Sequence, residues 1–296
     1  MRGRGWLPIL ASVALAACGP DARRDVEFRV ETEFGMESVW TEGYLVRAAR
    51  VLTRLMDTPD VQPPTRIAVT LTKDPKSGGI GGAASATELR FTSNVWPEEP
   101  FRHWILAHEL TNLFAHHYAG SGGFPSDWWS NGRSPFPEYV SCLVMAQLGF
   151  VEDAAWRKGV GKGKRDHELY WTLHRAHGFE LFAKFFRLLR ADGVDLGKIG
   201  KTWPHADAMR STYAIAYLSL AAGQNLATVF RDHGIGKKPS DWDAIHPDKP
   251  FEEYEVAPKT VDLLLATRER LFVARAKDGK AEPLRARFRA GEPSPR

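Results

Sequence analysis

The stretch His108-Glu109-Leu110-Thr111-Asn112 has the spacing of a zinc-binding helix motif, with one departure. In a His-Glu-x-x-His helix the two imidazoles are four residues apart, so both point from one face toward one ion. The Glu between them can then activate a metal-bound water. His108 and Glu109 occupy their expected positions, but Asn112 stands where the second His belongs. Metal chemistry in this chain therefore depends on what Asn112 does.

An Asn side chain is a poor replacement for the missing ligand, because zinc prefers imidazole, thiolate or carboxylate donors and a catalytic site normally supplies three. The same predicted helix carries three more histidines, His103, His116 and His117. At ~1.5 Å of rise per residue, His116 lies about 12 Å beyond His108. The other two are rotated away, so none can share an ion with His108. We expect them to be solvated or helix-capping groups.

Residues 1–17 have the pattern of an export signal. Arg2 and Arg4 form a basic start, and the apolar run that follows is too short and too early to span a bilayer. Leu15-Ala16-Ala17 directly before Cys18 resembles the lipobox of bacterial lipoproteins. That resemblance implies lipidation of Cys18 as the first mature residue. The alternative is an ordinary cleaved signal in which Cys18 is incidental.

A lipidated Cys18 would anchor the chain to a membrane in the bacterial cell envelope. Gly19, rather than Asp, follows it, which resembles the pattern of an outer-membrane destination with a periplasmic or surface-exposed domain. The other cysteine, Cys142, lies in an apolar run and is expected to be a small buried hydrophobe, so no disulfide framework is predicted. Much of the net positive charge lies in the tail from Arg275 to Arg296, and nothing else indicates nucleic-acid binding.

Hydrophobic periodicity predicts an α+β fold in which a helix, the strands and the motif helix come first and a helical region follows. Strands are expected at 26–30, 66–72 and 88–92, and helices at 38–57 and 100–118, the second carrying the motif. The glycines of 78–82 predict a flexible turn rather than a phosphate loop, since no Lys-Ser/Thr follows. Further helices are expected at 137–148, 167–176, 178–191, 207–222, 224–233 and 258–276.

Three stretches resemble the gluzincin class of zinc metallopeptidases, with the closest likeness to the enhancin-like and basic-secretory-protein-like families. The first, 108–114, compares with a family pattern His-Glu-Met/Leu-Thr-His. The second, 128–141, compares with an aromatic-acid-Gly loop that leads into a helix containing Tyr. The third runs from Gly178-Phe179 to Gly234-Ile235 and compares with a helical region. Together the stretches span roughly 40–236.

This resemblance implies a zincin-like N-terminal lobe, with a small mixed sheet and the motif helix, followed by an all-helical C-terminal lobe. A cleft is expected where the two lobes meet near the motif. The implied division of the chain is a signal peptide over 1–17, a tether with the first strand over 18–30, the zincin-like lobe over 31–150, the helical lobe over 151–275 and a basic tail over 276–296.

Carried over position by position, the resemblance makes His108 a zinc ligand and Glu109 the general base. Asn112 falls on the second ligand position, and Asn131 falls on the third. Glu138 is the nearest carboxylate that could substitute as a ligand. Two amides at two ligand positions favour a site that has lost its zinc. Tyr213 fits the role of oxyanion stabiliser, although core packing is the more common use of such a residue.

Three functions stay open. The favoured one is an anchored lipoprotein whose metallopeptidase-like domain is degenerate at its metal site. The second is an active peptidase on proteins or glycoproteins, with unusual zinc ligands. The third is a non-catalytic lipoprotein that binds a peptide or glycan in the cleft. Trp128 and Trp129 would contact the ligand in each case, and Arg133 could bind a substrate carboxylate or phosphate.

Overall fold

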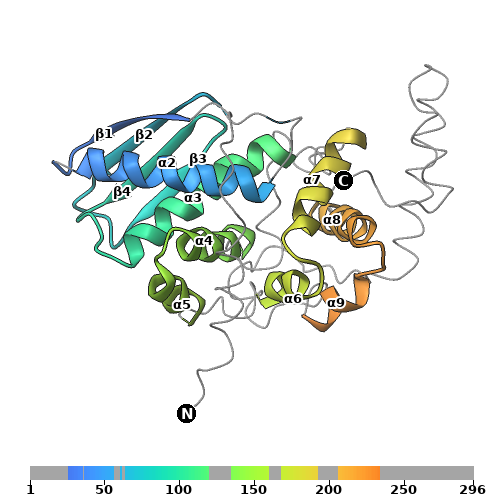
Figure 1. The fold of residues 1–296 in the computed structure, drawn as a ribbon. Helices are drawn as coiled ribbons and strands as arrows, with labels where there is room; N and C mark the ends of the chain where they lie inside the picture. The colour runs from blue at the N-terminus through green and yellow to red at the C-terminus, as the bar shows by residue number, and fades with distance from the viewer. Residues whose placement is uncertain are drawn as a thin grey trace, which may run out of the picture.

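The computed structural model describes residues 26–35, 37–56, 61, 64–119, 135–159, 168–192 and 206–233. Over these residues the chain is a mixed α+β protein with four strands and eight helices (Figure 1). In chain order the elements are β1 (Glu27–Thr32), α2 (Glu37–Met56), β2 (Arg66–Lys73), β3 (Gly81–Ala84), β4 (Glu88–Ser93), α3 (Phe101–Ala119), α4 (Pro135–Gln147), α5 (Val151–Gly159), α6 (Glu168–His177), α7 (Glu180–Asp192), α8 (Ala206–Ala222) and α9 (Ala227–Asp232).

The four strands form one mixed sheet in the order β1-β2-β4-β3. β1, β2 and β4 are parallel to one another, and β3 pairs antiparallel with β4 at the edge. Buried and exposed residues alternate along β2, with Ile67, Val69 and Leu71 buried and Arg66 and Ala68 exposed. This alternation is the pattern of a sheet with one packed face and one open face.

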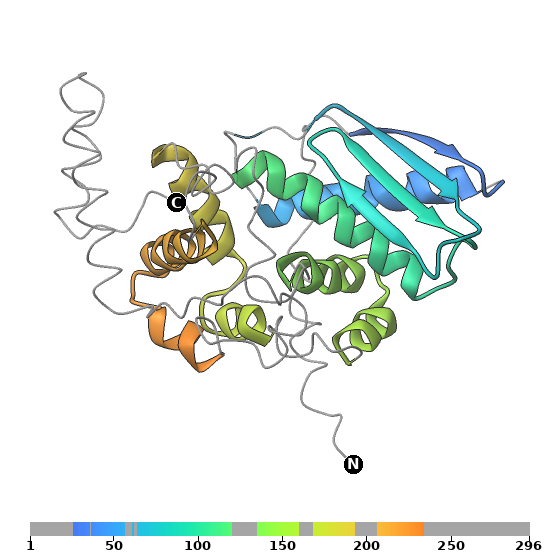
Figure 2. The same ribbon diagram turned by 180° about the vertical axis from the view of Figure 1, so that it is seen from behind.

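Helices α2 and α3 lie side by side against the packed face (Figures 1 and 2). α2 is amphipathic and makes the crossover between the parallel strands β1 and β2. α3 packs on the same face, along the edge formed by β3 and β4. Apart from its two ends and Asn112, α3 is buried on all sides, as expected of a helix between two layers.

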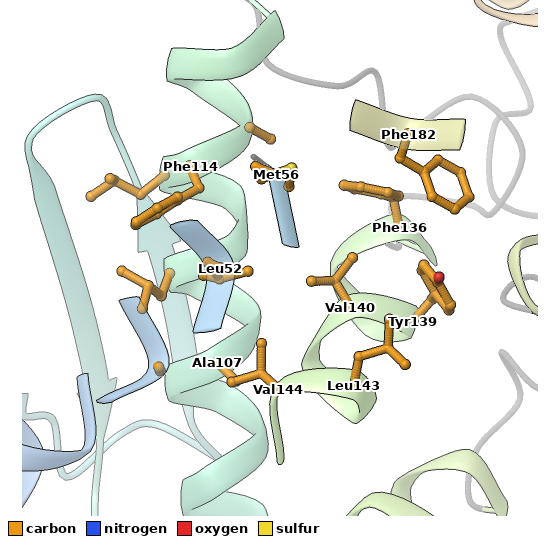
Figure 3. Close-up of a cluster of buried hydrophobic side chains, with 14 of the residues drawn as sticks. Leu52, Met56, Ala107, Phe114, Phe136, Tyr139, Val140, Leu143, Val144 and Phe182 are labelled. Carbon is orange, nitrogen blue, oxygen red and sulfur yellow. The ribbon is translucent and has the colours of Figure 1, made fainter. Parts of the chain in front are cut away.

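On the side of α3 away from the sheet, α4 to α7 form a helical layer. Figure 3 shows the apolar contact between the layers, in which Ala107 of α3 and Val144 of α4 lie beside each other, while Phe114 points toward the sheet. Phe182 of α7 packs beside Phe136 at the far end, with ring centroids 5.4 Å apart. One cluster of buried side chains therefore runs from the sheet into the C-terminal helices.

The end of α4 determines where α5 lies. Gly149 has a φ of +91°, a conformation that favours glycine, and the amide of Phe150 donates to the carbonyl of Met145 at 2.9 Å. This pair forms a helix-ending motif that satisfies the last carbonyls of α4. The chain then enters α5, which packs against both α3 and α4.

The strands expected at 26–30, 66–72 and 88–92 and the α+β class are confirmed, as are the helices predicted within the described residues. Two features differ. Gly81 and Gly82 belong to strand β3 rather than to a flexible turn, and α5 was not predicted at all. The signal, the tether, the helix at 258–276 and the tail lie outside the described residues. In the described part, no helix has the length and apolar character needed to cross a bilayer.

Candidate functional site

The motif residues lie on two successive turns of α3 in a nearly buried position. His108 is 8% exposed and Glu109 is 6% exposed, while Asn112 is half-buried. Because α3 is enclosed by the sheet on one side and by α4 on the other, these polar side chains must find partners inside the protein. The site is defined by what those partners are.

Asn112 uses its amide group on the neighbouring carboxylate. Its Nδ2 donates a hydrogen bond to Oε2 of Glu109 at 3.1 Å. The residue at the predicted second ligand position is thus a donor toward the predicted general base. One of the two carboxylate oxygens of Glu109 is therefore occupied by a hydrogen bond from within the motif.

The edge strand β3 closes over Glu109. A Cβ added to Gly82 would lie 2.5 Å from Oε1 and 2.7 Å from Cγ of Glu109, far inside contact distance. A Cβ added to the neighbouring Gly81 would meet only the carbonyl oxygen of Thr92, at 3.9 Å. Gly82 is therefore required for the close approach of the strand backbone to the carboxylate. This contact places the sheet edge directly beside the motif.

Glu138 of α4 reaches the motif from the opposite side, with Oε1 3.7 Å from Nδ1 of His108. Both of its oxygens are already used. Arg157 of α5 donates to Oε1 at 2.5 Å and to Oε2 at 2.7 Å, and the indole of Trp104 donates to Oε2 at 2.9 Å. The Arg157 guanidinium also stacks on the Trp104 ring at 3.7 Å. Glu138 is thus held in a fork that fixes its orientation.

These contacts decide the charge of Glu138. Burial alone raises the pKa of a carboxyl, but here it is outweighed. The hydrogen bonds from Arg157, the charges of His108 and Arg157, and the bond from Trp104 together hold the pKa of Glu138 below its ordinary value of 4.5. Glu138 is consequently ionised and neutralised by a protein cation at neutral pH.

The described residues around His108 do not fit a catalytic zinc. Among them, no group of three His, Cys, Asp or Glu ligand atoms includes His108. Nδ1 of His108 is buried without a hydrogen-bond partner, and the one carboxylate near it is already bound by Arg157. A dication placed there would also face the guanidinium charge. We therefore derive no chemical step through a metal at this motif.

The other predicted site residues are only partly described. Tyr213 lies in α8, but its side chain is not among those described. Cys18, Trp128, Trp129, Asn131 and Arg133 lie outside the described residues. Their roles, like that of Glu138 as a substitute ligand, stay predictions.

The expectation that His103 is a solvated or capping group is wrong, since this residue is fully buried. Its Nδ1 lies 2.5 Å from Oδ2 of Asp153 on α5, and its Nε2 lies 3.2 Å from Oε1 of Glu99. Glu99 precedes His103 by four residues, a spacing that the sequence shows, but Asp153 is fifty residues away. Only the packing of α5 on α3 brings the third residue in.

No protein-family model matches the sequence, and no curated protein is significantly similar to it.

Proposed function

We propose that this chain is an envelope lipoprotein whose folded part is a metallopeptidase-like domain that binds extended polypeptide without a catalytic zinc. The observation that carries the proposal is the contact between Gly82 of the edge strand and Glu109 of the motif. A polypeptide that extends the sheet at β3 would run alongside the motif turn. Among the described residues, that turn has no set of ligands that would make it a zinc hydrolase.

The backbone of β3 supports strand addition. The amide of Ser85 donates to the carbonyl of Glu88 at 2.9 Å, and bonded pairs alternate along an antiparallel ladder. By this alternation the N–H and C=O groups of Gly82 and Ala84 point away from β4. Within the described residues β3 has no other neighbour in the sheet. With only Gly and Ala side chains, the strand offers main-chain groups and little steric hindrance.

The motif supports binding rather than hydrolysis. Glu109 accepts a hydrogen bond from Asn112, and Glu138 is neutralised by Arg157. A general base that works on a metal-bound water needs the metal, and the described residues around His108 offer no set of three ligands for one. The favoured function is therefore the degenerate one. The alternative of an active peptidase would require ligands from Asn131 or other residues outside the described part.

Fluorescein-labelled casein, an unfolded polypeptide, tests both halves of the proposal in one sample. Residues 19–296 are titrated into it, with anisotropy reporting binding and dequenching reporting cleavage. We expect saturable binding, no cleavage, and no effect of EDTA on the affinity. Ala84→Pro removes an outward N–H without removing a ladder bond, so it should weaken binding at least tenfold.

Ala84→Ser is the matched control, because it keeps the N–H and changes little volume. It should bind casein like the wild type. Equal binding by the Ala84→Pro variant would overturn the edge-strand site. Casein cleavage that is lost in Glu109→Gln would overturn the claim that the domain is not catalytic.

The anchor is a separate part of the proposal and rests on the sequence around Cys18. In a Gram-negative host, radiolabelled palmitate should enter the full chain and the protein should sediment with membranes. Cys18→Ser should abolish both. A Cys18→Ser chain that still sediments with membranes would contradict lipidation as the anchor.

A further inference from the structure

The cluster of Glu99, His103 and Asp153 lies at the N-terminal end of α3, away from the motif turn. In the described part of the chain it is the one group of three potential ligands whose atoms lie within 4.8 Å of one another. We propose that Glu99 and His103 bind a divalent transition-metal ion, and that Asp153 orients the His103 ring. This site is independent of the polypeptide-binding function proposed above.

The His103 ring is held rigidly by aromatic packing. Phe150 stacks on one face with centroids 3.8 Å apart, and Tyr44 and Trp40 lie at 5.3 and 5.4 Å. Gly149 directly precedes Phe150, and its left-handed backbone conformation directs the chain so that Phe150 lies over the ring. A ring fixed in this way cannot turn to exchange its two nitrogens, so each nitrogen keeps one environment.

Asp153 determines which nitrogen carries a proton. Its Oδ2 lies 2.5 Å from Nδ1 of His103, within hydrogen-bond distance. An ionised carboxylate only accepts, so the proton of a neutral His103 lies on Nδ1 and the lone pair lies on Nε2. A ring nitrogen bonded to a carboxylate, with the lone pair of the other nitrogen left for the ion, is the usual arrangement of a metal-ligating histidine.

Nε2 of His103 lies close to Glu99 without making a hydrogen bond. The atom is buried and has no hydrogen-bond partner, although Oε1 of Glu99 lies only 3.2 Å away. Oε1 is therefore off the direction in which an N–H bond would point. Two donor atoms on a tetrahedral ion with bonds of about 2.05 Å are about 3.4 Å apart, and neither points at the other. The Glu99–His103 pair has that arrangement.

Asp153 is not a third ligand to the same ion. Its 2.5 Å separation from Nδ1 is too short for two ligands of one metal, and the two nitrogens of one ring point in different directions. The ion would therefore take two protein ligands and complete its shell with water. Glu99 is half-exposed, with 51% of its side chain accessible, so water can reach this side.

Arg102 limits the affinity of the site. Its Nη2 donates to Oε1 of Glu99 at 3.0 Å, but the same guanidinium also bonds Glu37 at 3.2 Å and lies 3.8 Å over the Trp40 ring. Arg102 therefore keeps two partners when Glu99 turns toward an ion. With a positive charge nearby and two protein ligands, we expect micromolar binding. The imidazole selects Zn²⁺, Ni²⁺ or Cu²⁺ over Mg²⁺.

Calorimetric titration of zinc chloride into EDTA-stripped residues 19–296 tests the proposal, with magnesium chloride as the comparison ion. We expect one zinc per chain and no magnesium binding at the same concentration. Glu99→Gln, a half-exposed change that leaves the core intact, should weaken zinc binding at least tenfold. His103→Gln should do the same, and circular dichroism will show whether that buried variant folds.

His108→Gln is the matched control on the same helix and should bind zinc like the wild type. No zinc binding by the wild type, or unchanged binding in Glu99→Gln, would overturn the proposal. Zinc lost in His108→Gln but kept in Glu99→Gln would overturn both this site and the zinc-free motif. The two proposals can therefore fail separately.

Discussion

His103 and His108 lie five residues apart on α3, and each faces a carboxylate that an arginine also contacts. At His108 the carboxylate is Glu138, and both of its oxygens are held by Arg157 and Trp104. At His103 it is Glu99, which accepts hydrogen bonds only through Oε1 in the described part of the chain. The motif contains His108, whose neighbouring carboxylate Glu138 is already neutralised by Arg157. The pair that can still bind an ion, His103 and Glu99, lies outside the motif.

This difference supports our proposal that the motif has lost its metal. Glu138 and Arg157 form a compact pair next to His108, and the guanidinium supplies the positive charge that an ion would otherwise bring. At His103, Asp153 fixes the tautomer and leaves Nε2 with no hydrogen-bond donor or acceptor in line. The two sites therefore differ in how many side-chain oxygen and nitrogen atoms have no hydrogen-bond partner among the described residues. This difference is clearer than the difference in sequence between the motif and the residues around His103.

The largest expected loss of stability comes from removing the arginine that neutralises Glu138 beside His108. Arg157→Met leaves Glu138 charged and largely buried without its cation, so the free energy of unfolding should fall by about 3 kcal/mol. Urea titration followed by circular dichroism measures it. Arg29→Met removes an exposed cation from its pair with Glu27 and should change stability by less than about 0.5 kcal/mol. Equal losses of stability in the two variants would mean that the hydrogen bonds from Arg157 to Glu138 do not stabilise the site.

Asp153→Asn probes the same helix on the His103 side. The amide oxygen can still accept from Nδ1 of His103, so the loss of stability should be smaller than for Arg157→Met, about 1 kcal/mol. The same urea titration measures it. A loss as large as that of Arg157→Met would show that an amide cannot replace the Asp153 carboxylate beside His103.

Gly82→Ala should lower the free energy of unfolding by about 1–3 kcal/mol, because the added Cβ collides with the Glu109 carboxylate. Either that side chain or β3 then has to move. Gly81→Ala places the same methyl group one residue earlier in open space and is expected to cost less than about 1 kcal/mol. Thermal unfolding of the two variants compares them directly. If both are equally stable, β3 does not close over the motif as described.

The pH dependence of stability should carry a contribution from Glu138. Its pKa is lowered in the folded state, so this carboxyl stabilises the fold above its ordinary value of 4.5. The contribution is lost as the pH falls from that value through the lowered one. Urea midpoints measured between pH 6 and 3 should fall less steeply in Glu138→Gln than in the wild type. Parallel curves would contradict the pKa lowering.

The smallest effect is expected for Asn112→Ala. It removes one hydrogen bond to Glu109 at a half-buried position, so stability should fall by about 0.5–1 kcal/mol. Zinc binding should not change, because in our account Asn112 is not a ligand. A zinc affinity lowered tenfold by this substitution would show that the amide coordinates metal.

The sequence predicts the elements well where their periodicity is strong. The alternation of β2 and the apolar spacing of α2 were sufficient to place both elements within two residues. β3 was missed because its Gly-Gly-Ala-Ala sequence has no strand propensity of its own, and only pairing with β4 makes it extended. α5 was missed because it is short and its apolar face is narrow.

Only the part of the candidate site that lies on one continuous helix could be predicted from the sequence. His108, Glu109 and Asn112 share one helix, so their proximity follows from spacing alone. Arg157 and Asp153 reach α3 from α5, whose position depends on the left-handed conformation of Gly149 and on packing. No local pattern carries that information. For the same reason a solvated His103 was a reasonable expectation, and it was wrong because Phe150 covers the ring.

Anomalous scattering from crystals of residues 19–296 soaked in zinc chloride tests the central claim most directly, because it locates each ion without a variant. The account predicts a peak beside Nε2 of His103 and Glu99 and no peak at His108. A zinc peak bound by His108, with or without a second peak at His103, would contradict it.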